Sequence, residues 1–505
     1  MDFFKRHKFE IFVLVVLTLI YLASRFYSIL SLPIFTDEAI YIRWAQIAKQ
    51  DANWRFISLT DGKQPMFIWL MMISLRFIAD PLLAGRIISV EAGFVTLIGM
   101  YFLGREIFKS NKIGLISSAL YVIFPMALVY DRMALYDSLV GTFTIWALFL
   151  IILLARKIRM DIALILGMVI GGGVLTKTNA FFSIYLLPFS LLLFNWGEKA
   201  IKNRLLKWIG LCLISVALAY GFYSILRLSP FFHIIAEKNA IFVYPLTEWL
   251  QHPLEFFIVN CQAFWDWTNR YLTWPLLILA ASSFLIAGNF AKEKIVLFLW
   301  FIVPIITLGI FGKTLYPRFI FFMILPLLPL AAFSLVNIYS RFKKVYLFII
   351  FCFLAFILAF KTDYLILTDF AKSHIPSSDI QQYLTRWPAG GGIKKSIEFF
   401  EKEAKKGKIY IATQGTFGLL PYAFEIYLIN NPNIKIEGYW PVEDTIPAKV
   451  IEESKKIPTY FVFYQPCFSC KENVDTGIAP IPWNLKPVLQ MKGGVNTYTS
   501  IYRIK

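Results

Sequence analysis

Long apolar runs, separated by short polar connections, fill the first 361 residues of the chain. Most of them approach the ~20 residues that a helix needs to cross about 30 Å of hydrocarbon at 1.5 Å per residue. We therefore expect an α-helical polytopic membrane domain with about eleven transmembrane helices over residues 1–361. The expected spans are Ile11–Leu32, Leu83–Leu103, Ile113–Tyr130, Ser138–Leu154, Ile162–Leu175, Ala180–Phe194, Leu205–Leu226, Leu272–Phe290, Ile295–Phe311, Pro317–Val336 and Val345–Phe360.

From Thr362 onward the pattern changes to shorter amphipathic segments. Apolar residues with helical spacing predict one helix, and short runs of β-branched and aromatic residues predict strands. The helix is marked by Ile393, Ile397, Phe400 and Ala404, a second helix is expected around Gly418–Ile429, and the strands are expected at Lys408–Thr413, Thr459–Tyr464 and Tyr498–Ile504. Residues 362–505 are thus predicted to form a small α/β domain, which is long enough to bury its own core.

The composition agrees with a membrane protein and excludes two other classes. Of the 505 residues 58% are hydrophobic and only 16% are charged, whereas soluble domains have roughly 25% charged residues. A wholly soluble enzyme is therefore excluded. An intrinsically disordered chain is excluded because 49 Phe, 25 Tyr and 14 Trp supply too much apolar surface.

The net charge of +18 is explained by membrane orientation. Eighteen basic residues fall at cytoplasmic positions and seven in the short loops on the opposite side, provided that the short apolar segment Pro65–Ile78 lies in the interface without crossing. The positive-inside rule then predicts a multi-pass cell membrane protein with a cytoplasmic N-terminus and an extracytoplasmic C-terminal domain. If Pro65–Ile78 crosses, the C-terminal domain is cytoplasmic. Since the basic excess has this explanation, no nucleic-acid partner is expected.

Four carboxylates fall at the outer face under this topology: Asp37 and Glu38 after the first helix, and Asp131 and Asp137 between the third and fourth. Ionisable groups in a membrane region have no solubility role, so they indicate function. The structural alternative is that Thr36 or Asp37 caps a surface helix, with Glu38 in its first turn, and that Asp137 caps the next span. Asp131 and Arg132 could equally form a solvated loop pair.

Two basic residues also allow two interpretations. Lys63 precedes the interfacial segment, where it is either a snorkelling anchor or a cation for a lipid-linked phosphate at headgroup depth. Arg86 lies five positions before Glu91, a carboxylate within the second span, and the two could form a structural pair.

The chain offers no pattern of metal ligands. Its four histidines, His7, His233, His252 and His374, are dispersed, so we expect no metal and no cofactor, although converging carboxylates would accommodate a divalent ion. Cys467 and Cys470 form a C-x-x-C pair for which a local disulfide is an option in an extracytoplasmic domain.

Several short motifs, taken in their order, resemble the GT-C type glycosyltransferases. They are the Asp37-Glu38 pair, the Lys63-Gln64-Pro65 turn, Arg86 and Ser89, the Leu135–Ser138 connection and the Leu175-Thr176-Lys177 turn. The branch they resemble most contains the protein O-mannosyltransferases and the lipid A aminoarabinose transferases. The resemblance covers residues 1 to roughly 200 and weakens beyond, with Trp387–Gly392 similar to a turn in the extracellular domains of some prokaryotic members.

This resemblance implies an inverting glycosyltransferase that moves a sugar from a polyprenyl monophosphate to an acceptor hydroxyl of a protein, glycolipid or polymer, on the extracytoplasmic face. Asp37 is then the expected base and Asp137 a second catalytic carboxylate, because a hydroxyl is a weak nucleophile until its proton is accepted. Cations stabilise the departing phosphate. The expected phosphate-binding residues are Lys63, Arg132, Lys313 and Arg318, with Glu38 and Arg86 as supporting residues.

Two other functions compete with this one. A lipid or solute transporter or flippase would also be basic and polytopic, but transporters usually contain two related halves with broken helices near mid-membrane. The chain shows no such halves, and its acids cluster at one face. A membrane-anchored binding module would leave the charged residues at the outer interface unexplained.

Overall fold

The computed structural model describes residues 7–286, 288, 290–342, 344–467, 477–494 and 497–505, so Lys5, Arg6, Lys343 and Cys470 lie outside the described residues. The chain divides into two compact units. The helical unit contains residues 1–27, 55–67 and 88–376, and the mixed unit contains residues 28–54, 68–87 and 377–505. The expected boundary after Lys361 falls inside one helix, α19.

Within the described residues, six helices are long and apolar enough to cross a membrane. They are α2 (Lys8–Phe26), α5 (Pro81–Phe108), α8 (Tyr136–Lys157), α11 (Ile201–Ser224), α16 (Ala291–Phe311) and α19 (Val345–Thr368). The helices Pro317–Ile324 and α18 (Leu327–Tyr339) are bent by 48° and add a seventh span if they count as one. The chain is therefore a polytopic helical membrane protein with six or seven candidate spans.

The remaining expected spans correspond to shorter or interrupted helices. They are α6 (Asn111–Val122) with α7 (Pro125–Tyr130), α9 (Met160–Val174), α10 (Phe182–Tyr185) between two 3-10 turns, and α15 (Trp274–Ser282). Pro125 and Pro275 each stand in the first turn of a helix, because proline lacks the N–H that a helix interior needs. The helical unit also contains α12 (Ile234–Phe242), α13 (Leu246–Trp249), α14 (Phe257–Leu272) and α17 (Phe321–Ile324).

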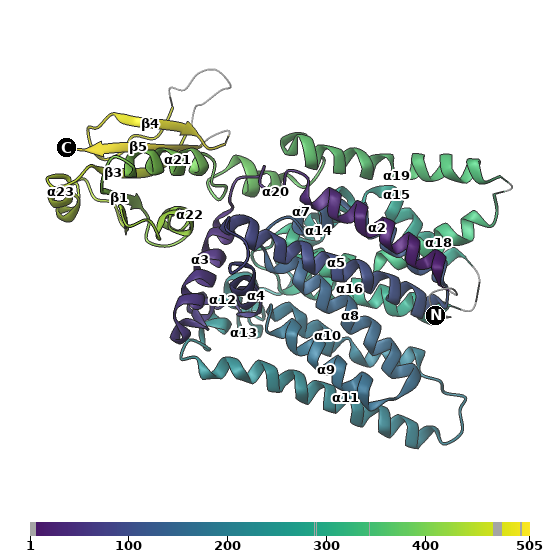
Figure 1. Ribbon diagram of the computed structural model, residues 1–505. Coiled ribbons are helices and arrows are strands. Elements are labelled where there is room, and N and C mark those ends of the chain that lie inside the picture. Colours follow the sequence, from purple (N-terminus) through teal and green to yellow (C-terminus); the bar gives the residue numbers. More distant parts are fainter. Residues whose placement is uncertain (1–6, 287, 289, 343, 468–476, 495–496) are drawn as a thin grey trace. The chain divides into compact units, whose positions relative to one another are not determined.

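Glycines let α9 and α11 pack closely in the helical unit (Figure 1). A Cβ atom on Gly167 would lie 2.9 Å from the backbone oxygen of Ser215, and one on Gly171 would lie 2.6 Å from the ring of Phe222. The Ser215 hydroxyl donates across the same contact to the backbone oxygen of Ala163, at 2.8 Å. Small residues spaced four apart are typical of close helix packing in membranes.

The segment Pro65–Ile78 contains one short helix, α4 (Met66–Ser74). Nine residues rise only about 13 Å, less than half the thickness of the hydrocarbon core, so α4 is too short to span by itself.

The mixed unit contains a five-stranded sheet in the order β2-β1-β3-β5-β4. Figure 1 labels β1, β3, β4 and β5. The strands are β1 (Ile409–Gln414), β2 (Ile434–Tyr439), β3 (Thr459–Pro466), β4 (Pro487–Lys492) and β5 (Thr497–Ile504). The first three are parallel, and β5 pairs antiparallel with both β3 and β4. The accompanying helices are α3 (Thr36–Gln50), α20 (Ser377–Ile380), α21 (Ile393–Ala404), α22 (Leu419–Leu428) and α23 (Ala448–Ser454).

The core of this sheet is aromatic. Phe461 and Phe463 stack at 4.7 Å, and the Trp483 ring stands edge-on to both. Cys467, just after β3, is disulfide-bonded. The buried positions of α21 include Ile393, Ile397, Phe400 and Ala404, as their helical spacing predicts.

The N-terminal stretch of the mixed unit is hydrogen-bonded to its C-terminal stretch. Both the backbone N–H and the hydroxyl of Thr36 donate to the backbone oxygen of Pro388, at 2.8 and 2.9 Å. The N–H of Gly390 donates to the backbone oxygen of Ile34 at 2.6 Å. The turn Trp387–Gly392 is thus bound to the start of α3, the helix that carries Asp37.

Candidate active site

Asp37 and Glu38 occupy the first turn of α3 in the mixed unit. The residue that caps this helix is Phe35, so the expectation that Thr36 or Asp37 caps it is wrong. The Glu38 carboxylate instead accepts the Phe35 N–H at 3.0 Å, since it stands at the third helical position from which a side chain can reach back. Asp37 is only partly buried, whereas Glu38 is completely buried.

Arg86 at the start of α5 fixes the position of Glu38. Its Nε and one terminal nitrogen donate to the two carboxylate oxygens, at 2.9 and 2.8 Å, and both side chains are fully buried. The same guanidinium donates to the backbone oxygens of Ile29, Leu32 and Pro33. Arg86 therefore holds the whole loop that leads to Asp37. Its acidic partner is Glu38, so the expected structural pair with Glu91 is wrong.

Asp131 and Arg132 are buried in the helical unit, which overturns their interpretation as a solvated loop pair. The Asp131 carboxylate accepts from Tyr21 at 3.1 Å, Tyr121 at 3.1 Å and Ser138 at 2.8 Å. Burial raises the pKa of Asp131 to about 6, although the nearby Arg25 and the hydrogen bonds oppose the rise.

Arg132 donates to the backbone oxygens of Arg25 and Tyr27 at the C-terminal end of α2, at 3.2 and 2.7 Å. A cation there satisfies helix carbonyls that have no partner inside the helix and meets the negative end of the helix dipole. The structure thus gives Arg132 a helix-capping contact, and its expected contact with the donor phosphate stays a prediction.

Asp137 lies in the first turn of α8 and pairs with Lys177. The Lys177 ammonium is 2.7 Å from the Asp137 carboxylate oxygen, and Asp137 is 4% exposed. Leu135 is the capping residue of α8, so Asp137 does not cap this helix as the structural alternative expected.

Two cations lie against one pair of aromatic rings, Phe242 and Phe319, whose centroids are 5.6 Å apart. Lys177 lies 4.6 Å from the Phe319 centroid, and Lys63 lies 5.5 Å from the Phe242 centroid. Two further cations lie near along the chain. Arg318 precedes Phe319, and its guanidinium lies 5.4 Å from the Tyr316 centroid. The Lys313 backbone N–H donates to the Phe242 oxygen at 2.8 Å, and its ammonium pairs with Glu248 at 3.0 Å. We call Lys63, Lys177, Lys313 and Arg318 the basic cluster; all four lie in the helical unit.

The loop that carries Lys63 is fixed by two side-chain contacts with other segments of the helical unit. Asp61 accepts from Lys238 of α12 at 2.6 Å, and the Gln64 amide donates to the Thr178 hydroxyl at 2.7 Å. Gly62 is left-handed, with φ of 65°, and a Cβ there would meet the Lys238 Cβ at 2.5 Å. Glycine is thus required for the turn that presents Lys63.

The sequence-predicted set has one clear omission. Lys177 belongs to a motif of the resembled family but was not among the expected phosphate-binding residues, although it is the cation that joins Asp137 to the basic cluster. A lysine between two threonines after the glycine-rich end of α9 was the available signal. Among the described residues, no group of three or more His, Cys, Asp or Glu side chains is arranged to hold a metal ion.

Comparisons with known proteins confirm the resemblance to the GT-C type membrane glycosyltransferases. Residues 62–222 match the family model described as dolichyl-phosphate-mannose-protein mannosyltransferase. Comparison with curated proteins gives no match.

Solved structures share the fold over nearly the whole chain. ArnT from Cupriavidus metallidurans bound to undecaprenyl phosphate aligns over 98% of both chains with a TM-score of 0.57 and 13% identity. The apo state of the same ArnT aligns with a TM-score of 0.55 and 13% identity, over 98% of this chain and 97% of that chain. The archaeal oligosaccharyltransferase AglB from Archaeoglobus fulgidus aligns with a TM-score of 0.52 and 14% identity, over 91% of this chain and 70% of that chain. That structure is a complex with an inhibitory peptide and a dolichol-phosphate. The chain thus shares its fold with these proteins and is similar to the mannosyltransferase family over residues 62–222.

Proposed function

We propose that the protein is an inverting glycosyltransferase that moves a hexosyl or pentosyl group from a polyprenyl monophosphate to an acceptor hydroxyl at the extracytoplasmic face. The observation that carries this proposal is the basic cluster, since Lys63 and Lys177 over one ring pair, with Lys313 and Arg318 near along the chain, suit a phosphate at headgroup depth. The likeness to an ArnT bound to undecaprenyl phosphate supports a donor of that class.

In the proposed reaction the acceptor oxygen attacks the anomeric carbon of the sugar while the bond from that carbon to the phosphate oxygen breaks. The bonding electrons leave with the polyprenyl phosphate, and the proton of the acceptor hydroxyl passes to the Asp37 carboxylate. One displacement from the face opposite the leaving group inverts the anomeric centre. Such a base contributes about 10²–10⁴-fold to the rate.

The leaving phosphate gains negative charge as the bond breaks, and the basic cluster is the group of cations proposed to stabilise it. Electrostatic stabilisation is strongest where the charges are fixed beforehand and water is scarce. Asp137 contributes by holding the Lys177 ammonium at 2.7 Å, so we assign it a positioning role beside the phosphate.

Asp37 must keep a constant position for proton transfer, and Arg86 and Glu38 provide it. Their buried bidentate pair holds both the loop before α3 and the residue that follows Asp37. Since Glu38 is completely buried and paired, Asp37 is the member of this acidic couple that we assign as the base.

The test is transfer by the purified protein, reconstituted in liposomes with a panel of polyprenyl-phosphate sugars, measured as released polyprenyl phosphate and as labelled acceptor. We expect Asp37→Asn to reduce kcat by at least 10²-fold, because an amide cannot accept the proton. We expect Lys63→Ala to lower kcat/KM for the donor, because one cation of the phosphate site is lost.

Matched controls separate these effects from misfolding. Asp51→Asn makes the same chemical change just beyond the other end of α3, and Lys112→Ala removes an exposed lysine of α6; both should leave transfer unchanged. Undiminished transfer by Asp37→Asn would refute the assigned base. Movement of the lipid across the membrane without any transfer would favour the flippase alternative.

A further inference from the structure

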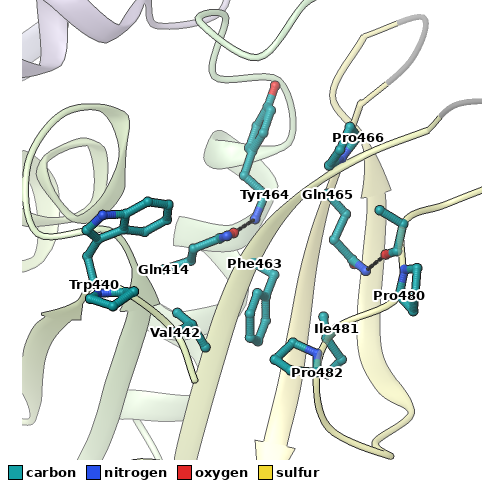
Figure 2. A pocket seen from close by; sticks show the side chains of 12 residues that line it. Gln414, Trp440, Val442, Phe463, Tyr464, Gln465, Pro466, Pro480, Ile481 and Pro482 are labelled. Atoms are coloured by element: carbon teal, nitrogen blue, oxygen red, sulfur yellow. Dashed lines mark hydrogen bonds between the residues drawn. The ribbon is translucent and has the colours of Figure 1, made fainter. Parts of the chain in front are cut away.

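The C-terminal part of the mixed unit contains a pocket of about 280 Å³ that the proposed reaction does not use (Figure 2). It is lined by the ends of three parallel strands. Gln414 ends β1, Trp440 directly follows β2, and Phe463 and Gln465 lie near the carboxyl end of β3. Pro480–Pro482 form the opposite wall.

This position is the one at which open α/β sheets bind ligands. The chain passes from β1 outward to β2 on one side and then returns to place β3 on the other side of β1. The direction of the connections therefore reverses between β1 and β3, and ligands bind at the carboxyl ends of the strands beside such a switch point. Gln414 and Gln465 stand at the ends of these two strands.

The lining limits the chemistry of the ligand. None of the described residues that line the pocket is charged, which favours a neutral ligand. Trp440 is 67% exposed and offers an indole face at the rim, with Phe463 deeper in the pocket. Ligand sites typically combine such aromatic surface with a few polar groups that fix orientation.

Two hydrogen-bond donors are available at this site. The Gln414 side-chain oxygen accepts the Tyr464 N–H at 3.3 Å, which leaves the amide NH₂ of Gln414 without a partner in the described part of the chain. The indole N–H of Trp440 likewise has none among the described residues. Gln465, in contrast, is held by Ala479 and Tyr502. The ligand therefore presents oxygen acceptors together with an apolar face.

We propose that this pocket binds one unit of a neutral saccharide, as part of the acceptor or the glycan being built; the latter role rests on the proposed function. A sugar ring combines hydroxyl and ring oxygens with an apolar face of C–H groups. A proline-rich peptide also has carbonyl acceptors, but such peptides bind along extended grooves with successive aromatic contacts. A single pocket of about 280 Å³ lies at the low end for ligand sites and suits one ring.

The test uses the full-length protein in nanodiscs made without glycolipids, because sugar-headed detergents would compete for the pocket. The probes are mannotriose, maltotriose, the anionic trimer of galacturonic acid and a decaproline peptide, followed by saturation-transfer NMR and titration calorimetry. We expect a neutral trisaccharide to bind with saturation of its ring protons. We expect Trp440→Ala to weaken that binding at least tenfold.

Two further variants define the contacts. Gln414→Glu keeps the oxygen that accepts the Tyr464 N–H but replaces the NH₂ donor with a second oxygen, so it should also weaken binding. Trp387→Ala removes another exposed tryptophan, 61% exposed and outside the pocket, and should bind as the wild type does. Equal melting temperatures for all variants exclude unfolding as the cause.

The outcomes separate this proposal from the proposed function. Saccharide binding that Asp37→Asn retains and Trp440→Ala loses supports the pocket, whether or not the protein transfers sugar. Absence of neutral saccharide binding, binding unchanged in Trp440→Ala, or binding of decaproline in place of the sugars would overturn it, even in a protein that is active in transfer.

Discussion

Arg86 uses all five donor positions of its guanidinium on a single stretch of chain: two bonds to Glu38 and three to the backbone oxygens of Ile29, Leu32 and Pro33. A lysine has the same charge but lacks the planar fork, so it cannot reproduce this pattern. Arg86 is therefore a positioning residue for Asp37.

We expect Arg86→Lys to lower kcat at least tenfold while the KM for the donor changes little, because the base moves while the basic cluster is untouched. Arg86→Met should also destabilise the fold by about 3–5 kcal/mol, because it leaves the Glu38 charge buried without its partner. Adding Glu38→Leu should recover stability but not activity. Steady-state kinetics measures the effect on kcat and KM, and thermal unfolding measures the effect on stability. A changed donor KM with normal kcat would contradict the positioning role.

At the residue scale, the sequence predicted the types of group at the site but not their partners. Glu38 and Arg86 were expected as supporting residues, yet Glu91 seemed as suitable a partner for Arg86 because it is close along the chain. Arg132 and Lys177 were indistinguishable as outer-face cations. Only the packing of distant segments sends Arg132 to the end of α2 and Lys177 to Asp137.

At the scale of elements, the contact between α9 and α11 depends on glycines that the sequence presents simply as small residues. The approach at Gly167 leaves a Cβ only 2.9 Å from the backbone of Ser215, while a Cβ at Gly221 of α11 would meet nothing within 4 Å. The two glycines therefore form a matched pair for mutation.

We expect Gly167→Ala to destabilise the protein by about 1–3 kcal/mol, since the two helices must separate or shift. Gly221→Ala should be neutral or stabilising, because alanine is favoured over glycine in a helix by about 1 kcal/mol. Thermal unfolding of both variants in the same nanodiscs measures the difference. Equal melting temperatures would show that the close helix contact contributes nothing to stability.

Whether a strand could be predicted from the sequence depended on its place in the sheet. β1, β3 and β5 are interior strands and were predicted from their apolar residues, whereas β2 and β4 are the two edges. Edge strands avoid uncontrolled pairing by using polar and charged side chains, which also weakens the pattern that marks a strand. Lys435 and Glu437 in β2 show this directly.

At the scale of the whole molecule, the asymmetry of basic residues predicts the orientation in the membrane. With an odd number of spans, as in the eleven expected from the sequence, and the short helix α4 not crossing by itself, the C-terminal domain is expected outside the cytoplasm. Alkaline phosphatase fused after Lys505 should therefore be active. Green fluorescent protein fused at the same position should not fluoresce, because it would be exported from the cytoplasm. The reverse result would place the C-terminal domain in the cytoplasm.

The division into two units could not be predicted from the sequence. A change of pattern after Thr362 marks where the small sheet domain begins, but nothing local shows that residues 28–54 and 68–87 belong with it. That association depends on hydrogen bonds such as those between Thr36 and Pro388, whose partners are 352 positions apart.

This arrangement has a consequence for how the protein is made. The stretch that carries Asp37 leaves the ribosome early, while the turn at Pro388 and Gly390 that fastens it follows some 350 residues later. At 5–20 residues per second this delay lasts roughly 20–70 s. During synthesis the nascent chain therefore holds its apolar helices before Asp37, the proposed base, is fastened in place, and we expect the proposed transfer to begin only when translation is nearly complete.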